Sequence, residues 1–411
     1  MKIKVREATE DDCKFLFDLR NHPIVRNASF NTEEISFSHH QDWFHKKIND
    51  PNTTIFIGLS ASNEKIGMVR FQKEDDSAFV SIAILPIHHN QGYGTSILKE
   101  TCSSFFLSEK SVNEVVAEIK NTNTPSLKMF DKAGFVQTAS KNENSIMRLY
   151  RRLDSYEIGV KIFTTNKESF RKLRELHEKG VIDYIELYIV PEVVDTDSLS
   201  VLKDLPIIFH APNINHGFNL RDKDRIFDSS LNTIRNISNY LKVNTIIFHP
   251  GLESGKRDIK MIKETLLELK QDYDVILENM PKKPVRGQRN IIASNYEEFR
   301  EITTDIELKI CVDIGHTICS ANYYGENPLE YLQKFINLRP FMIHIGDGDY
   351  SSQADIHKSL LEGNFPLIEI LSLIHPNSRI TLETPKSDFI LLSEDLMNLQ
   401  ILKNLIRASQ R

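Results

Sequence analysis

The sequence predicts an α/β protein in two parts: an α+β domain over residues 1–153 and a (β/α)8 barrel over residues 156–411. The length of 411 residues exceeds a typical domain of ~100–200 residues, so two domains are expected. Short strands and helices follow one another in mixed order in the first part, whereas eight apolar runs alternate with helical patterns after residue 156. Eight buried parallel strands in ~250 residues match the size of a closed barrel.

The first domain contains strand-like and helix-like segments in an irregular order. Strands are expected at residues 2–6, 54–59, 65–72, 79–85 and 115–119, and helices over residues 10–21, from Gly94 onward, and ending near Gly134. The residues between Tyr150 and Tyr156 form the expected join between the domains. No low-complexity linker marks this join, so we expect packed rather than tethered domains.

The second domain repeats a strand-then-helix pattern. The expected strands lie at residues 157–163, 184–189, 207–210, 245–249, 275–278, 309–313, 341–344 and 379–383. An open doubly wound sheet is the alternative, but it would need a glycine-rich turn after its first strand, and the segment after Phe163 reads TTNKES. The pattern therefore favours the closed barrel.

Composition limits the classes of partner and compartment. With 51 basic and 57 acidic residues, the formal charge of -6 argues against a nucleic-acid or anionic-membrane partner. Four cysteines without a C-x-x-C spacing do not describe a disulfide framework or a cysteine-based zinc site. Neither a signal-peptide core nor an 18-residue apolar run is found, so we expect a soluble cytoplasmic protein. The oligomeric state is not predicted.

A glycine-containing turn in the first domain has the composition of a phosphate-binding loop. Residues 84–95, ILPIHHNQGYGT, lead from a strand into a helix, and free N–H groups at a helix N-terminus hold anions. A second segment, Asn123-x-x-Ser126 followed by FDKAGF at residues 130–135, comes after a further strand. Together these segments resemble the signature of the GCN5-related N-acetyltransferases (GNAT), and the resemblance covers most of residues 1–150.

This resemblance implies an acetyl-CoA site. The residues that would bind its pyrophosphate are His89, Asn90, Gln91, Gly92, Tyr93 and Gly94, and Asn123 and Ser126 would lie along the pantetheine arm. The segments at residues 20–21, 25–26 and 40–44 resemble members that acetylate nucleotide-linked amino sugars of the pseudaminic-acid type, so the implied partner is a small amino sugar or nucleotide sugar.

Two positions depart from the acetyltransferase pattern. His89 stands where the turn usually opens with Arg or Gln, which is tolerable because backbone N–H groups do most of the holding. Phe130 replaces the tyrosine that commonly protonates the departing thiolate, so another group or a water would have to act, or the activity is lost. Glu118 and His40 are the candidates for the general base, although a solvated carboxylate and a surface histidine are the structural alternatives.

Histidines and carboxylates close the predicted barrel strands. In such barrels the catalytic groups gather at the C-terminal ends of the strands. Neutral imidazoles and ionised carboxylates are ligands for Zn²⁺ or Mn²⁺. One such residue alone is more often a capping group, but the set is large. Its members at successive strand ends are His210, His249, Glu278, Asp313 with His316, His344 and Glu383, and Asp355 and His357 lie in a loop.

These strand ends resemble the xylose isomerase-like superfamily and, within it, the endonuclease IV branch. The pieces that carry the resemblance are HAP at 210–212, FHPG at 248–251, LEN at 277–279, VDIGH at 312–316, IHIGD at 343–347, DIH at 355–357 and LETP at 382–385. The resemblance implies that the nine side chains bind up to three zinc ions, with Glu278 also catalytic. Sugar isomerases and epimerases keep a single-metal subset, which here would be Glu278, Asp313, His344 and Glu383.

The ligand count favours hydrolysis of a phosphate ester over isomerisation, because several ions can hold phosphoryl oxygens and neutralise the leaving oxygen. Asn213, in place of an aromatic residue, and the reduced glycine loop at 362–364 depart from DNA-cleaving relatives. Residues 1–153 carry a charge of +1 and the remainder -7, which is unfavourable for duplex binding. The basic run at 282–286, KKPVR, is either a phosphate grip or a solvated loop.

The fusion itself suggests consecutive steps on one small molecule. The first hypothesis is therefore a bifunctional enzyme of amino-sugar or nucleotide-sugar biosynthesis, with acetyl-CoA-dependent N-acetylation in front and metal-dependent hydrolysis of a sugar phosphate or nucleotide ester in the barrel. A sugar isomerase or epimerase is the second hypothesis for the barrel. An abasic-site DNA endonuclease with an accessory front domain is the third.

Overall fold

A computed structural model describes residues 3–141, 143–150, 156–191, 195–255, 257–283 and 289–409. The chain divides into two compact units, Met1–Arg151 and Arg152–Arg411. Most of the predicted join, residues 151–155, lies outside the described residues. Among the described residues, none of the helices combines the length and the apolar composition that a membrane span requires.

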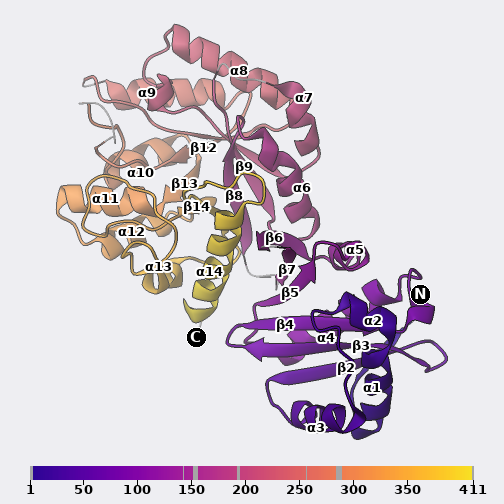
Figure 1. The fold of residues 1–411 in the computed structure, drawn as a ribbon. Coiled ribbons are helices and arrows are strands. Elements are labelled where there is room, and N and C mark those ends of the chain that lie inside the picture. Colours follow the sequence, from indigo (N-terminus) through magenta and orange to yellow (C-terminus); the bar gives the residue numbers. More distant parts are fainter. Residues whose placement is uncertain are drawn as a thin grey trace. The chain divides into compact units, whose positions relative to one another are not determined.

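The first unit is a seven-stranded sheet in the order β1-β2-β3-β4-β5-β7-β6 (Figure 1). Its strands are β1 (Lys4–Glu7), β2 (Thr53–Leu59), β3 (Lys65–Glu74), β4 (Ser77–Ile84), β5 (Glu114–Lys120), β6 (Val136–Lys141) and β7 (Asn144–Tyr150). Its helices are α1 (Cys13–Asn21), α2 (Pro23–Ala28), α3 (Phe37–Ile48), α4 (Tyr93–Ser108) and α5 (Thr124–Lys132).

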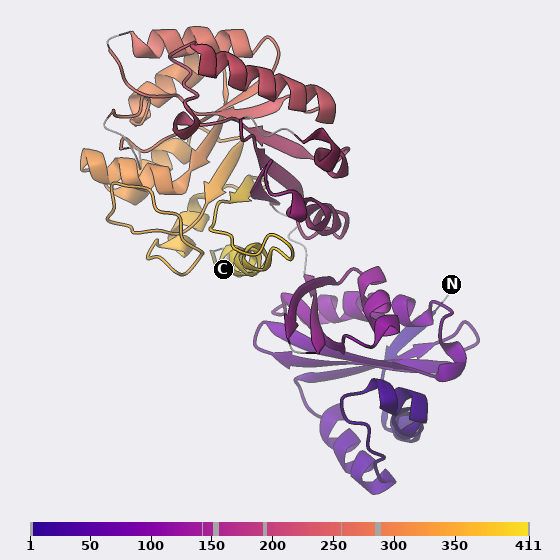
Figure 2. The same cartoon turned by 45° about the horizontal axis from the view of Figure 1, so that its top comes forward.

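Helices cover both faces of this sheet because β2 is apolar on both sides. Ile55 and Ile57 pack with Leu16 of α1 and Phe44 of α3, whereas Phe56, between them, belongs to the core that α4 and α5 cover. Figure 2 shows the sheet edge-on with helices above and below it. The sequence expectations did not include α2, α3 or the hairpin of β6 and β7.

The second unit is a closed barrel of eight parallel strands in the order β10-β11-β12-β13-β14-β15-β8-β9. The strands are β8 (Glu157–Phe163), β9 (Tyr184–Tyr188), β10 (Ile207–His210), β11 (Thr245–Phe248), β12 (Asp274–Glu278), β13 (Lys309–Asp313), β14 (Met342–Ile345) and β15 (Arg379–Leu382). Every expected barrel strand is found within two residues of its expected ends, so the closed barrel is confirmed.

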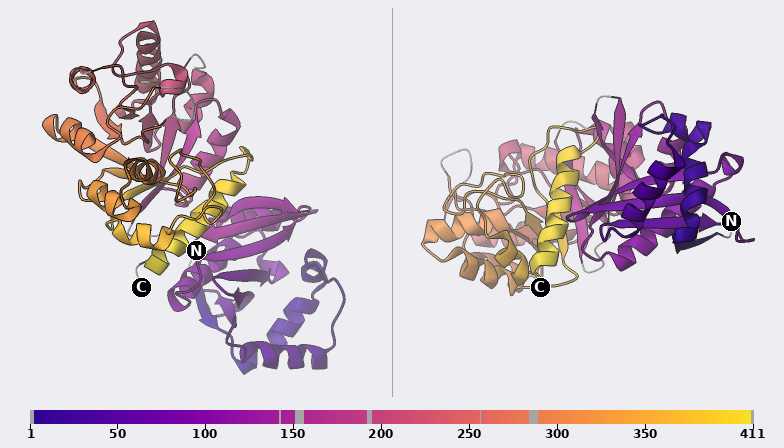
Figure 3. Two further views of the ribbon diagram at one scale, coloured as in Figure 1. Left: turned by 90° about the vertical axis from the view of Figure 1, so that its left-hand side faces the viewer. Right: turned by 60° about the horizontal axis from the view of Figure 1, so that its bottom comes forward.

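Helices follow the barrel strands and surround them, as Figures 1 and 3 show. They are α6 (Phe170–Glu178), α7 (Thr196–Leu199), α8 (Arg225–Leu241), α9 (Asp258–Leu269), α10 (Tyr296–Asp305), α11 (Ile314–Tyr324), α12 (Pro328–Ile336), α13 (Leu367–Leu373) and α14 (Ser393–Ser409). Because both faces of each strand are covered, β9 and β10 are buried along their whole length.

Candidate functional sites

The barrel interior changes from apolar to charged along each strand. Its lower layer is a hydrophobic cluster of Tyr184, Ile208, Ile247, Ile276, Cys311 and Met342. Side chains in a strand alternate between two faces, so the residue two positions later points into the barrel again. Those residues are Glu186, His210, His249, Glu278, Asp313 and His344, and the strand periodicity therefore places one layer of ligand-type side chains at the C-terminal end of the barrel.

The first group of ligand-type atoms comes from three neighbouring strand ends. His210 Nε2 lies 2.8 Å from His249 Nε2, and His249 Nε2 lies 3.2 Å from Glu278 Oε2. Burial and then Lys161 lower the pKa of His210 to about 4, so its imidazole is neutral, as a metal ligand must be. His210 and Glu278 are almost fully buried.

The second group contains Glu278 again, with Asp313, His344 and Glu383. His344 Nδ1 lies 3.0 Å from Glu383 Oε2, 3.5 Å from Glu278 Oε1 and 3.8 Å from Asp313 Oδ2. Burial and the neighbouring carboxylates, opposed by His316, raise the pKa of Asp313 to about 6. This shift reflects the repulsion between the three carboxylates that lie around one imidazole. A divalent cation bound between them would lower this repulsion.

The third group is formed by His316, Asp355 and His357. Asp313 caps α11 by accepting the N–H of His316 at 2.7 Å, and His316 Nδ1–H donates to the carbonyl of Asn279 at 2.9 Å. His316 Nε2 consequently faces Asp355 Oδ2 at 3.5 Å, and His357 Nε2 lies 2.9 Å from the same oxygen. Although burial opposes the charge, Asp355 and Glu383 raise the pKa of His357 to about 9.

The donor chemistry of these groups fits divalent metal ions. Within each group, one nitrogen or carboxylate oxygen of every residue lies within 4.8 Å of the corresponding atoms of the others. His344 Nδ1 and Glu383 Oε2 are buried without a hydrogen-bond partner, although they are neighbours. Although burial opposes the charge, Cys311, Glu186 and Glu278 raise the pKa of His344, so a divalent cation bound here would take the place of a proton. The structure thus brings together all nine residues that the sequence predicts as metal ligands; their role as ligands stays a prediction.

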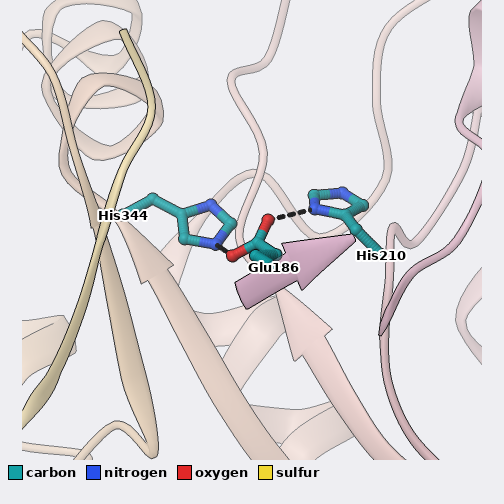
Figure 4. Close-up of side chains that lie close together, drawn as sticks. All are labelled: Glu186, His210 and His344. Carbon is teal, nitrogen blue, oxygen red and sulfur yellow. Dashed lines mark hydrogen bonds and ion pairs between the residues drawn. The ribbon is translucent and has the colours of Figure 1, made fainter. Parts of the chain in front are cut away.

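Two charged residues of this layer were not predicted from the sequence, Lys161 of β8 and Glu186 of β9. Lys161 Nζ lies 2.8 Å from Glu383 Oε1 and 3.7 Å from Glu186 Oε1. Glu186 is fully buried between His210 and His344 (Figure 4). Each interrupts an otherwise apolar strand, EIGVKIF and YIELY, and a charge inside a buried strand was the signal that could have revealed both.

A cavity of about 130 Å³ opens over these groups. Lys161 lines it together with Asn213, Asn215 and several of the ligand-type residues. Asn213 stabilises the loop after β10, since its side chain accepts the N–H of Asn215 and its own N–H donates to Tyr188 Oη. In the reduced glycine loop, a Cβ on Gly363 would lie 2.2 Å from Asp347 Oδ1 and from the Gly348 carbonyl, so a single glycine is what this close approach requires.

The basic run after β12 is only partly within the described residues, which exclude residues 284–288. Lys282 is buried and forms an ion pair with Glu253, and the Lys283 ammonium lies 5.6 Å from the Tyr323 ring. Lys282 is therefore buried and paired, whereas the sequence predicts either a phosphate grip or a solvated loop for this run.

In the first unit, the predicted pyrophosphate turn lies between β4 and α4. Gly92 caps α4 with a φ of 82°, a conformation that favours glycine, and Asn90 also has a positive φ of 58°. His89 Nε2 lies 2.9 Å from the carbonyl of Ile84 and so ties the turn to the end of β4. A Cβ on Gly94 would meet the sulfur of Met129 at 2.6 Å, so Gly94 permits close packing against α5.

The neighbouring strands β4 and β5 are parallel but pair only over three residues, Ser77–Phe79 with Glu114–Val116. Beyond this point the pairing stops, although β4 continues to Ile84 and β5 to Lys120. Backbone N–H and C=O groups in a strand need partners. An extended ligand carrying amide groups can supply them by lying between the two strands.

The other predicted acetyl-CoA residues lie at the start of α5. The Asn123 side chain accepts the N–H of Ser126 at 3.2 Å and so caps this helix, while Ser126 is half-buried. Phe130 is 3% exposed, and its ring packs edge-on against Phe135 with 4.9 Å between the centroids. Phe130 is therefore a core residue of the unit.

The two candidate bases have different surroundings. His40 of α3 is buried among Phe17, Trp43 and Phe44, and its Nε2–H donates to the carbonyl of Cys13 at 3.1 Å. Burial lowers the pKa of His40. Glu118 of β5 is exposed, and its carboxylate accepts a hydrogen bond from Asn144 at 2.7 Å. The described contacts do not bring His40 and Glu118 together, and the role of each as general base stays a prediction.

Residues 2–136 match the family model described as an acetyltransferase (GNAT) domain. The N-terminal unit carries a GNAT domain. With the closed barrel that follows it, this match confirms the predicted fold class.

Two solved structures resemble the chain over about its first domain's length. A spermidine N-acetyltransferase from Vibrio cholerae, in complex with CoA and spermine, is 18% identical with a TM-score of 0.33 and covers 36% of this chain and 94% of its own. An aminoglycoside acetyltransferase in complex with coenzyme A is 15% identical with a TM-score of 0.33 and covers 36% and 95%.

Two curated relatives match parts of the chain. An uncharacterized protein of Methanocaldococcus jannaschii is 35% identical over 111 residues, which are 26% of this chain and 34% of the relative. The chain thus spans about a third of the length of that relative. Endonuclease 4 of Thermus thermophilus is 25% identical over 219 residues, which are 48% of this chain and 74% of the relative. The likeness to Endonuclease 4 is in keeping with a barrel of this type.

Proposed function

We propose that this chain is a bifunctional enzyme that N-acetylates a small amino sugar or nucleotide sugar with acetyl-CoA and hydrolyses a phosphate or nucleotide ester of the same sugar in its barrel. Among the ligand-type groups of the described residues, the three that consist only of predicted ligands carry the barrel assignment, and the first two of them share Glu278. Divalent ions bound there, zinc or alternatively manganese, would hold phosphoryl oxygens, supply hydroxide near neutral pH and neutralise the leaving oxygen.

The chain's own residues suit a small anionic substrate. The Lys161 ammonium lines the cavity and offers N–H donors to an ester oxygen, and Asn213 and Asn215 add polar groups at its rim. The cavity of about 130 Å³ favours a small ester. The barrel half carries a formal charge of -7, which weakens the case for a polyanionic duplex.

The acetyltransferase assignment is supported by the GNAT match and by the opening between β4 and β5. In this proposal the pantetheine arm pairs with the free strand backbones, and the pyrophosphate lies at the N-terminus of α4 beside Gly92. His40 or Glu118 takes the proton from the substrate amine. The thiolate is protonated by a water or by a group other than Phe130, because that ring has no acidic proton and is buried.

Two alternatives are retained for the barrel, each because of one observation. The likeness to Endonuclease 4 favours incision of DNA at abasic sites. The completeness of the second group, Glu278 with Asp313, His344 and Glu383, favours a single-metal sugar isomerase or epimerase.

Metal content and acetyl-CoA binding test the proposal directly. We expect about three divalent ions per chain by elemental analysis, hydrolysis of p-nitrophenyl phosphate or its diester, and binding heat with acetyl-CoA. Glu278→Gln should abolish hydrolysis and lower the metal content while leaving acetyl-CoA binding unchanged. Glu157→Gln, at the opposite end of the barrel, is the matched control and should keep all three properties.

The alternatives give different results in the same experiments. A single ion per chain with isomerase activity would favour the sugar isomerase. Incision of an abasic-site duplex at moderate salt would show that the substrate of the barrel is DNA and not a sugar ester. Absence of any binding heat with acetyl-CoA would refute the acetyltransferase part.

A further inference from the structure

Glu186 connects two ligand-type histidines from opposite sides of the barrel layer (Figure 4). Its Oε1 lies 2.8 Å from His210 Nδ1, and its Oε2 lies 2.7 Å from His344 Nε2. An ionised carboxylate can only accept hydrogen bonds, so both imidazoles donate to it. In the neutral ring that binds a metal, the other nitrogen then carries the lone pair, so His210 Nε2 and His344 Nδ1 are the atoms that face the ligand groups.

The surroundings of Glu186 keep it in its charged form. The side chain is fully buried, and burial alone would favour the neutral acid. The Lys161 ammonium, 3.7 Å from Glu186 Oε1, compensates this buried negative charge. A neutral carboxyl group would carry a proton on one of its two oxygens. That oxygen could then not accept a hydrogen bond from its histidine with the geometry that the other oxygen has.

We propose that Glu186 is a positioning residue that fixes the tautomers of His210 and His344 at the same time, and thereby links the two metal sites that share Glu278. This inference rests on the proposed metal centre. His210 belongs to the first ligand group and His344 to the second, so one carboxylate sets the direction of a lone pair in each. Partners of this kind orient metal-binding histidines and tune their affinity.

Glutamine at this position separates positioning from mere space filling. The side-chain amide introduced by Glu186→Gln would have one acceptor oxygen, and its NH₂ group would donate, so only one of the two imidazoles could keep its hydrogen bond. The other imidazole would have to change tautomer and present an N–H, instead of a lone pair, to its metal site. The third group, His316 with Asp355 and His357, does not touch Glu186 in the described contacts and should be unaffected.

The experiment compares metal content and metal affinity in the full chain carrying Glu186→Gln, Glu186→Asp or Asp183→Asn. Asp183 precedes the same strand at its other end, where it accepts the N–H of Ile158 at 2.9 Å, so it is a matched control far from the ligand layer. We expect Glu186→Gln to lose one ion per chain, or to bind it about 10- to 100-fold more weakly in chelator competition. Glu186→Asp, which keeps the charge and both acceptors, should recover part of the affinity, and Asp183→Asn should match the wild type.

The outcomes distinguish this inference from the proposed function. Unchanged metal content and affinity in Glu186→Gln would overturn the positioning role while leaving the metal centre intact. Anomalous density for an ion directly bonded to Glu186 would also overturn it, because Glu186 would then be a ligand. A wild-type protein that binds no divalent ion would refute the metal centre and this inference with it. Circular dichroism of each metal-free variant shows whether a loss of ions reflects a loss of fold.

Discussion

The replacement of Lys161 by methionine should destabilise the metal-free barrel far more than the metal-loaded one. In the described ligand layer, Lys161 is the one lysine or arginine. Five carboxylates lie around Lys161 or around the residues next to it, and they are Glu186, Glu278, Asp313, Asp355 and Glu383. Methionine has a similar length but no charge. The substitution therefore removes the ammonium with little change of volume.

The size of the effect follows from the two distances. At an effective dielectric constant of 20, the Lys161 contacts of 2.8 Å to Glu383 and 3.7 Å to Glu186 correspond to about 6 and about 4.5 kcal/mol. Methionine avoids the several kcal/mol that desolvating the ammonium costs, so a net loss of about 3–5 kcal/mol is expected for the metal-free protein. For a domain of this size, such a loss lowers Tm by roughly 6–20 °C.

Bound divalent cations should replace most of the missing charge, so the Tm of Lys161→Met should approach that of the wild type when zinc or manganese is added. Differential scanning calorimetry with and without chelator measures both states. Lys172→Met, a buried lysine paired with Glu175 at 3.2 Å on α6, is the control, and its Tm change should be the same with and without metal. If metal-free Lys161→Met melted like the wild type, the charge balance argued for this layer would be refuted.

Three further outcomes are expected. Gly92→Val should weaken acetyl-CoA binding about tenfold in calorimetry, because valine at a φ of 82° is strained by roughly 1–3 kcal/mol at the turn; unchanged affinity would place the pyrophosphate elsewhere. Phe130→Tyr should lower the stability of the first unit by about 1–3 kcal/mol without raising acetyl transfer, because the new hydroxyl would be buried among core side chains; a faster reaction would contradict this placement. The metal affinity of the third ligand group should rise with pH until about pH 9 and then level off, because His357, with its pKa raised to about 9, must lose a proton before it can bind. Calorimetry in buffers of different ionisation enthalpy should detect this proton release near pH 7. A pH-independent affinity would argue against His357 as a ligand.

The expected barrel strands agree with the structure because each is a continuous apolar run, a local property of the sequence. The first unit was harder to predict. Helix α3, over Phe37–Ile48, contains three histidines and only a narrow apolar stripe, and β6 and β7 pair as a hairpin without a long apolar run. Phe130 also had an ambiguous sequence context, since its motif position suggested the reaction site whereas its ring packs into the core with Phe135.

Most of the nine predicted ligands follow from one rule, that functional groups gather where parallel strands end, whereas Asp355 and His357 lie in the loop after β14. Lys161 and Glu186 escaped this rule because they lie inside β8 and β9 rather than at their ends. The alternation from Tyr184 to Glu186 places the carboxylate in the barrel interior once the strand is known. The sequence, however, does not say which histidines it meets.

The sequence by itself determined the two-domain organisation, the eight barrel strands and the kinds of side chain offered at their ends, because apolar periodicity and residue chemistry are local. Only the tertiary structure decided how these groups meet. Closure of the barrel brings His344 within 2.7 Å of Glu186 across 158 positions of sequence, while His210 approaches from 24 positions away. The direction of each imidazole lone pair depends on these long-range hydrogen bonds, and so does the number of ions that the barrel can hold.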